Sequence, residues 1–82
     1  MDATLTVLER RLLLAATRTE FGDAREEPVW VFACFDVAVI DPKIGRGVVS
    51  SLEQKGLVVV QDWEGDERIL KITDAGKKAI EQ

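Results

Sequence analysis

Apolar residues recur at helical spacing near the start of the chain. Thr6 and Glu9 have the spacing of a capping box, in which each side chain accepts a hydrogen bond from the other residue's backbone N–H. The pattern predicts a helix from Val7 to Phe21, ended by Gly22. The inward stripe of this helix consists of Leu5, Leu8, Leu12, Ala15 and Ala16. The basic residues off the stripe, which we interpret as a solvated face, are Arg10, Arg11 and Arg18.

The segment Val29–Ile40 is apolar at nearly every position, so its period is ambiguous. It follows an acidic connector and Pro28, a residue that suits the first turn of a helix. Its β-branched and aromatic residues suit a buried strand, but its length of 12 residues and its place before another helix favour a helix. A helix this apolar must be covered on most sides. Either it fills the core, or it presents a self-association or partner surface that contains Trp30 or Phe32.

A second capped helix follows. Asp41 suits an N-cap and Pro42 the first helical position, so we expect a helix to about Lys55, with Gly56 as its C-terminal stop. Its inward face is Ile44, Gly45, Val48 and Leu52, with Val49 at the margin. Its outward face is Lys43, Arg46, Gly47, Ser50, Glu53 and Gln54. Gly47 in mid-helix costs about 1 kcal/mol relative to alanine, which indicates close approach by nucleic acid or by the preceding helix.

The last third of the chain alternates apolar and polar residues, as a half-buried hairpin does. We expect a strand over residues 57–63, a turn at Glu64–Asp66 and a return strand over residues 67–72. Thr73 or Asp74 then caps a final helix that carries Ala75, Ala79 and Ile80 on one side. The predicted fold class is α+β, as one domain over residues 1–82: three helices, a two-stranded hairpin and a C-terminal helix.

This order of elements resembles the winged helix-turn-helix domains of MarR-type and related bacterial and phage regulators. Three segments carry the resemblance: SSLEQKGLV (residues 50–58), DWEGDERI (residues 62–69) and ITDAGKKAI (residues 72–80). They are similar to the end of the family's recognition helix, to its wing, and to its closing pattern of aliphatic-Thr-x-x-Gly-x-x-x-aliphatic. The sequence departs from the MarR pattern in length, since it lacks room for the long terminal helices with which those regulators dimerise.

The resemblance implies that the helix over residues 42–55 enters the major groove of double-stranded DNA. Arginine can bond guanine in two places and glutamine adenine, while serine and lysine reach bases or phosphates. The residues implied to contact DNA from the recognition helix are Lys43, Arg46, Ser50 and Gln54. Those implied to contact the DNA backbone, from the wing and the C-terminal helix, are Arg68, Lys71, Lys77 and Lys78. A homodimer or protein partner would use the Val29–Ile40 region.

The charge distribution favours a competing function. The net charge is −4, and residues 1–41 hold eight acidic against four basic residues, whereas residues 42–82 hold seven of each. The acids around the predicted wing tip are Asp62, Glu64, Asp66 and Glu67, opposed by Arg68. They would repel phosphates, whose neutralisation dominates DNA affinity. The second hypothesis is therefore an acidic winged helix that binds a protein partner, as an adaptor or inhibitor, and does not bind DNA.

The composition excludes most catalytic chemistry. With no histidine and one cysteine, the chain cannot form the usual zinc ligand sets or an imidazole-based triad, and it has no glycine-rich phosphate loop. We therefore expect a non-enzymatic protein without cofactor or metal. Cys34 lies within an apolar run and is interpreted as a small buried hydrophobic residue. No apolar run approaches the roughly 20 residues that span a bilayer, and the first residues lack the basic-then-apolar layout of a secretion signal, so we expect a cytoplasmic protein without a membrane partner.

Overall fold

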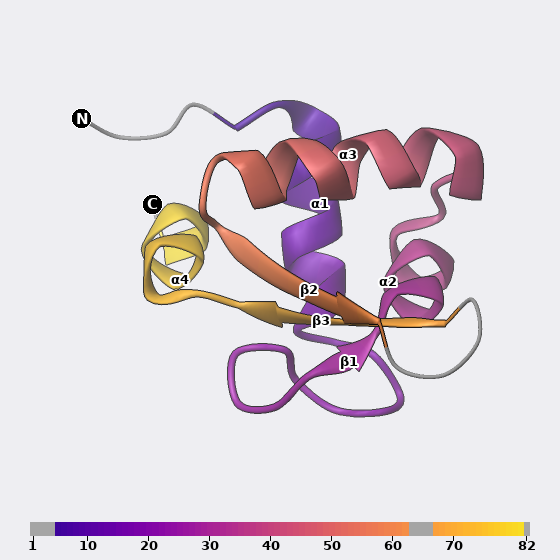
Figure 1. Ribbon diagram of the computed structural model, residues 1–82, viewed down its shortest axis with the longest axis horizontal. Helices are drawn as coiled ribbons and strands as arrows, with labels where there is room; N and C mark the ends of the chain where they lie inside the picture. Colours follow the sequence, from indigo (N-terminus) through magenta and orange to yellow (C-terminus); the bar gives the residue numbers. More distant parts are fainter. Residues whose placement is uncertain (1–4, 63–66, 82) are drawn as a thin grey trace.

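The computed structural model describes residues 5–62 and 67–81 of the chain. The described residues form four helices and a three-stranded antiparallel sheet with strand order β1-β3-β2 (Figure 1). In Figure 1, α1 and α3 lie on one side of the sheet, and α2 and α4 lie near its opposite ends. The α+β class and the winged-helix arrangement are confirmed. The sheet has one more strand than the sequence predicted.

Helix α1 (Val7–Ala16) begins at the predicted capping box and ends earlier than predicted. The Glu9 N–H donates to Thr6 Oγ1 at 3.1 Å, and the Thr6 N–H donates to Glu9 Oε1 at 2.8 Å. The helix stops at Ala16 because the Thr17 hydroxyl and N–H both donate to the Leu14 carbonyl, at 2.7 and 3.1 Å. The predicted end at Phe21 is therefore wrong. Gly22, at φ 131°, shapes the turn that follows.

The ambiguous segment 29–40 contains both a strand and a helix. Strand β1 (Val29–Trp30) pairs with β3, and helix α2 (Val31–Ala38) follows directly. Pro28 therefore precedes a strand, and its expected place in a helical turn is wrong. The strand forms because the far end of the chain supplies a pairing edge, with Val29 opposite Leu70. Local sequence preferences contain no information about that partner.

Helix α3 (Pro42–Gln54) begins and ends where the sequence predicted. The Asp41 carboxylate accepts a hydrogen bond from the Lys43 N–H at 2.8 Å, and Gly56 takes the left-handed conformation after the helix, at φ 75°. The buried residues of its inward face are Gly45, Val48, Val49 and Leu52. Ile44, which was expected to face inward, is 55% exposed. Gly45 takes the inward position of this turn, directly against the ring of Phe35 on α2.

The hairpin strands β2 (Val58–Asp62) and β3 (Arg68–Ile72) pair in register from Val58–Ile72 to Asp62–Arg68. The predicted turn at residues 64–66 lies outside the described residues. Helix α4 (Asp74–Glu81) is capped by Thr73, whose hydroxyl accepts from the Gly76 N–H at 3.1 Å and donates to the Gly56 carbonyl at 2.7 Å. One side chain thus joins the end of α3 to the start of α4.

The core lies between α1, α2, α3 and the inner face of the sheet. Its fully buried side chains include Leu12, Leu13, Leu52, Leu70, Ile72 and Cys34. Burial raises the pKa of the Cys34 thiol to about 12, so it packs as a small hydrophobic side chain, as predicted. No helix among residues 5–62 and 67–81 has the length and apolar content required to cross a membrane.

Two glycines of α3 provide a matched pair of stability predictions. A Cβ on Gly45 would lie 2.5 Å from the buried ring of Phe35, whereas nothing lies within 4 Å of a Cβ on Gly47. Gly45→Ala is therefore expected to destabilise the fold by roughly 1–3 kcal/mol through overpacking. Gly47→Ala is expected to stabilise it by about 1 kcal/mol through helix propensity. Urea denaturation followed by circular dichroism measures both, and equal effects would contradict the described packing of α2 against α3.

Candidate nucleic-acid interface

The position of α3 depends on a buried carboxylate of α1. Glu9 has a side chain that is 2% exposed, and its Oε1 lies 2.7 Å from Lys55 Nζ while its Oε2 accepts from the Ser51 hydroxyl at 2.6 Å. The same Oε1 accepts the Thr6 N–H that completes the capping box. Ser51 and Lys55 are one helical turn apart near the end of α3, so two contacts attach this end of the helix to α1.

The environment of Glu9 keeps it ionised. Burial alone would raise the pKa of this carboxyl, but the hydrogen bonds from Lys55, Ser51 and the Thr6 N–H outweigh burial and lower the pKa from 4.5 to about 2. A buried charge that is paired and fully hydrogen-bonded resists rearrangement, because the loss of any one partner leaves the charge uncompensated. The orientation of α3 on the core is thereby fixed at its C-terminal end.

With α3 held in this orientation, the predicted recognition residues share one exposed stripe. Lys43, Arg46, Ser50 and Gln54 follow each other at three- and four-residue spacing and are all exposed. Gly47 lies within the stripe, and no other part of the described chain covers it. Ile44 adds an apolar side chain near the start of the helix, which the sequence analysis missed.

Arg46 and Ser50 also line a groove of about 770 Å³ between α2, α3 and the hairpin. The apolar side chains on its surface include Val31, Phe35 and Val49. The charged residues that line the groove are Asp36, Arg46, Glu53, Asp62, Glu67 and Arg68. The acids therefore outnumber the bases in this groove, and the positive charge of α3 is concentrated towards its N-terminal half, where Lys43 and Arg46 lie.

Of the four residues implied to contact the DNA backbone, Arg68 lines the groove beside α3, and the other three lie outside that groove. Arg68 lies across the hairpin from Asp62 and its Nε is 3.4 Å from the Asp62 carboxylate, with both side chains exposed. Lys71 points to the outer face of the sheet, because its neighbours on β3, Leu70 and Ile72, are buried. Lys77 and Lys78 belong to α4, at the opposite end of the sheet from α2 (Figure 1), and Lys77 Nζ lies 3.6 Å from Asp74 Oδ1. Contacts of these residues with DNA stay predictions.

The apolar segment leaves an aromatic surface exposed. Phe32 is 46% exposed, and its ring stacks on Trp30 with centroids 5.9 Å apart. Phe21, from the connector before β1, contacts the same ring edge-on at 6.0 Å and is also 46% exposed. The sequence analysis assigned Phe21 to the end of a helix and so missed its place beside Phe32. The use of this surface by a partner remains untested.

The described residues contain no group of three or more histidine, cysteine, aspartate or glutamate side chains positioned to hold a metal ion. The carboxylates of the groove, between α2, α3 and the hairpin, are accordingly surface charges in this arrangement. What the stripe on α3 offers chemically is a guanidinium, an ammonium, a hydroxyl and an amide on one helical face. This set can donate hydrogen bonds to anionic oxygens and to the edges of bases.

The sequence matches no protein-family profile and no curated protein. In structure, the chain is similar to PcaV, a transcriptional regulator from Streptomyces coelicolor solved in complex with its natural ligand. The TM-score is 0.78 at 20% identity, over 94% of this chain and 51% of PcaV. It is also similar to Bordetella bronchiseptica BpsR, whose DNA binding is regulated by 6-hydroxynicotinic acid. There the TM-score is 0.77 at 20% identity, over 98% of this chain and 53% of BpsR.

A third similar structure is ZitR from Lactococcus lactis, a zinc-responsive member of the MarR family. The TM-score is 0.71 at 12% identity, over 99% of this chain and 52% of ZitR. The chain has the winged-helix fold of MarR-type regulators. The resemblance stated from the sequence is confirmed at the level of fold, and the winged-helix domain spans about half the length of these structures.

Replacement of Glu9 tests what holds α3 of the winged-helix domain in place. The pKa of Glu9 is near 4.5 in the unfolded chain and about 2 in the folded one. Its ionisation therefore contributes about 3 kcal/mol of stability above pH 4.5, which is lost as the pH falls towards 2. Glu9→Gln is expected to lower the unfolding free energy by roughly 2–3 kcal/mol at pH 7, and the difference from wild type should vanish near pH 2.

The measurement is urea denaturation at a series of pH values between 2 and 7. The control is Glu20→Gln, which removes the same charge from an exposed side chain of the connector. A pH-independent difference between Glu9→Gln and wild type would show that the carboxylate does not act through its charge.

Proposed function

We propose that this winged-helix domain binds double-stranded DNA and serves a transcriptional regulator, with the N-terminal half of α3 in the major groove. The fold and its similarity to transcription regulators support the proposal. The observation that carries it is Gly47, which lies between Lys43, Arg46 and Ser50 on an open helical face. A glycine in mid-helix costs about 1 kcal/mol, and no contact within the described chain requires it.

The proposed roles follow from the chemistry of each side chain. Arg46 presents the planar donor pair that bonds guanine O6 and N7 together, and Lys43 places a point charge at the first turn, near phosphate or a base edge. Ser50 lies one turn further along α3. Gln54, at the end of the helix, reaches an adenine only if α3 lies deep in the major groove. The missing side chain of Gly47 lets the helix backbone approach the DNA closely.

The acids of the wing limit this mode of binding. Asp62 is the last residue of β2 and Glu67 directly precedes β3, and Arg68, the first residue of β3, lies against Asp62. These charges favour a complex in which α3 makes most contacts and the wing stays off the phosphates. Few phosphates are then neutralised, and a slope near −2 in log K against log salt is expected if Lys43 and Arg46 are the main cations.

The second candidate function is a protein-binding module without DNA affinity. The observation that favours it is the combination of an acidic groove beside α3 and an exposed aromatic surface around Phe32. If this second function is correct, the domain does not bind a mixed-sequence DNA duplex at tens of micromolar protein in low salt. The same titration therefore decides between the two functions. In both, the domain is non-enzymatic.

Arg46→Ala is expected to weaken DNA binding by about 1–3 kcal/mol without loss of stability, because its side chain is exposed and outside the core. Lys43→Ala should weaken binding less and reduce the salt slope by about one. Fluorescence anisotropy of a labelled duplex at low and physiological salt measures both. The control is Arg11→Ala, which removes the same charge from the exposed face of α1. Equal weakening by all three variants would indicate nonspecific attraction.

Gly47→Ala separates DNA contact from stability, because the two effects have opposite signs. The variant is expected to be more stable by about 1 kcal/mol, since alanine is the better helix former and nothing lies within 4 Å of the added Cβ. It is expected to bind DNA at least about tenfold more weakly, because the methyl group prevents close approach of the helix. A variant that is stabilised and binds DNA as wild type does would refute the role of Gly47.

A further inference from the structure

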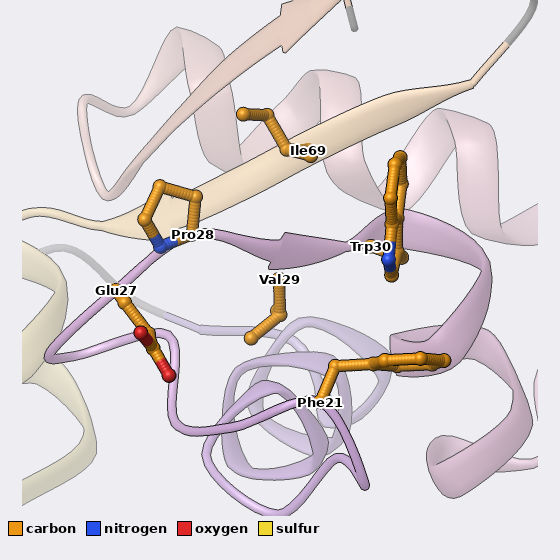
Figure 2. Close-up of a pocket in the computed structure, with 6 residues that line it drawn as sticks. All are labelled: Phe21, Glu27, Pro28, Val29, Trp30 and Ile69. Carbon is orange, nitrogen blue, oxygen red and sulfur yellow. The ribbon is translucent and has the colours of Figure 1, made fainter.

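A separate pocket opens on the outer face of the sheet, away from α3. Its volume is about 370 Å³, and it is lined by Phe21, Glu27, Pro28, Val29, Trp30 and Ile69 (Figure 2). Ile69 alternates on β3 with Arg68 and Leu70, and Arg68 lines the groove beside α3 instead. The two concavities therefore lie on opposite faces of β3.

The aromatic side chains of the pocket are partly exposed and contact a common neighbouring ring. Phe21 and Trp30 line the pocket, and both contact the ring of Phe32, with centroids 6.0 Å apart for Phe21 and 5.9 Å apart for Trp30. The planes of Phe21 and Phe32 meet at 72°, and those of Trp30 and Phe32 at 27°. Because the rings contact one another, their positions are already restricted. A ligand that binds there would therefore cause only a small further loss of side-chain conformational entropy.

The opposite side of the pocket carries a carboxylate. Figure 2 shows Glu27 across the pocket from Phe21 and Trp30, with Pro28 and Val29 between them. The Glu27 side chain lies against Gly22, where an added Cβ would meet Oε1 at 2.6 Å, so the absence of a side chain at Gly22 creates its place. Among the described residues, no hydrogen bond or ion pair engages the Glu27 carboxylate.

Glu27 is the one charged residue among those that line the pocket, and the connector that carries it is rich in acids. The connector before β1 carries Glu20, Glu26 and Glu27 in addition to Asp23 and Arg25, which form an ion pair at 2.7 Å. Lys71 is the one exposed base that β3 adds to the same face. An apolar pocket with aromatic side chains and one carboxylate in its lining is complementary to a cation that carries its own apolar stem.

We propose that this pocket binds an arginine side chain of a protein partner. The guanidinium would stack against the rings of Trp30 and Phe21 and pair with the Glu27 carboxylate, while its methylene stem contacts Ile69 and Pro28. The volume is at the lower end of the range for ligand pockets, about 300–1,000 Å³, and so fits one side chain of an extended segment. The site goes beyond DNA binding, because it uses neither α3 nor the groove beside it.

The test is a titration of ¹⁵N-labelled protein with the peptide acetyl-Gly-Gly-Arg-Gly-Gly-amide, followed by amide chemical shifts. The matched peptide carries citrulline, which has the same shape without the charge. Saturable shifts centred on Phe21, residues 27–30 and Ile69 are expected with the arginine peptide alone. Glu27→Gln and Phe21→Leu should each weaken binding by about twofold to fivefold.

The control variant is Glu53→Gln, which removes the same charge from the α3 side and should leave the peptide affinity unchanged. Phe21 is 46% exposed, so Phe21→Leu should keep the fold, as an otherwise unaltered spectrum would show. Three outcomes would each overturn the proposal: equal binding of the citrulline peptide, shifts centred on α3, or equal weakening by Glu53→Gln and Glu27→Gln. DNA titrations of the same variants report on α3 independently.

Discussion

The buried carboxylate of Glu9 is the constraint on which the arrangement of the helices depends. Its two oxygens take hydrogen bonds from the first turn of α1 and from two side chains near the end of α3. A charge in this position is expensive unless every partner is present, so the network specifies one relative placement of the two helices. The stripe of Lys43, Arg46 and Ser50 faces solvent because the opposite side of α3 is held in this way.

The fold was predictable from the sequence wherever a helix end is determined by local chemistry. The capping box at Thr6, the Asp41–Pro42 start, the Gly56 stop and the Thr73 cap all lie where the residues indicated. What failed depended on distant partners. The apolar segment is divided into β1 and α2 because β3 supplies an edge for Val29 and Trp30. The early end of helix α1 is the exception, because it is local: the Thr17 hydroxyl and N–H both donate to the Leu14 carbonyl.

The candidate site shows the same division. The exposed stripe of α3 was predictable because helical periodicity places residues on a face without reference to the rest of the molecule. The exposure of Ile44 was not, since it depends on Gly45 approaching Phe35. The proximity of Arg68 to Asp62 follows from the register of the hairpin, and the clustering of Phe21 with Phe32 follows from the path of the connector. Neither the register of the hairpin nor the path of the connector can be deduced from the amino-acid composition or from the spacing of apolar residues.

The turn between α2 and α3 begins with an unusual residue, since Val39, the C-cap of α2, takes the left-handed conformation at φ 55° and is 83% exposed. A β-branched residue is strained there, and strain of this kind costs about 1–3 kcal/mol. The turn therefore does not itself favour the angle between α2 and α3. Contacts outside the turn determine that angle. The packing of Gly45 on Phe35 and the contacts of α3 with Glu9 hold the two helices in place, and they thereby keep Val39 in its strained conformation.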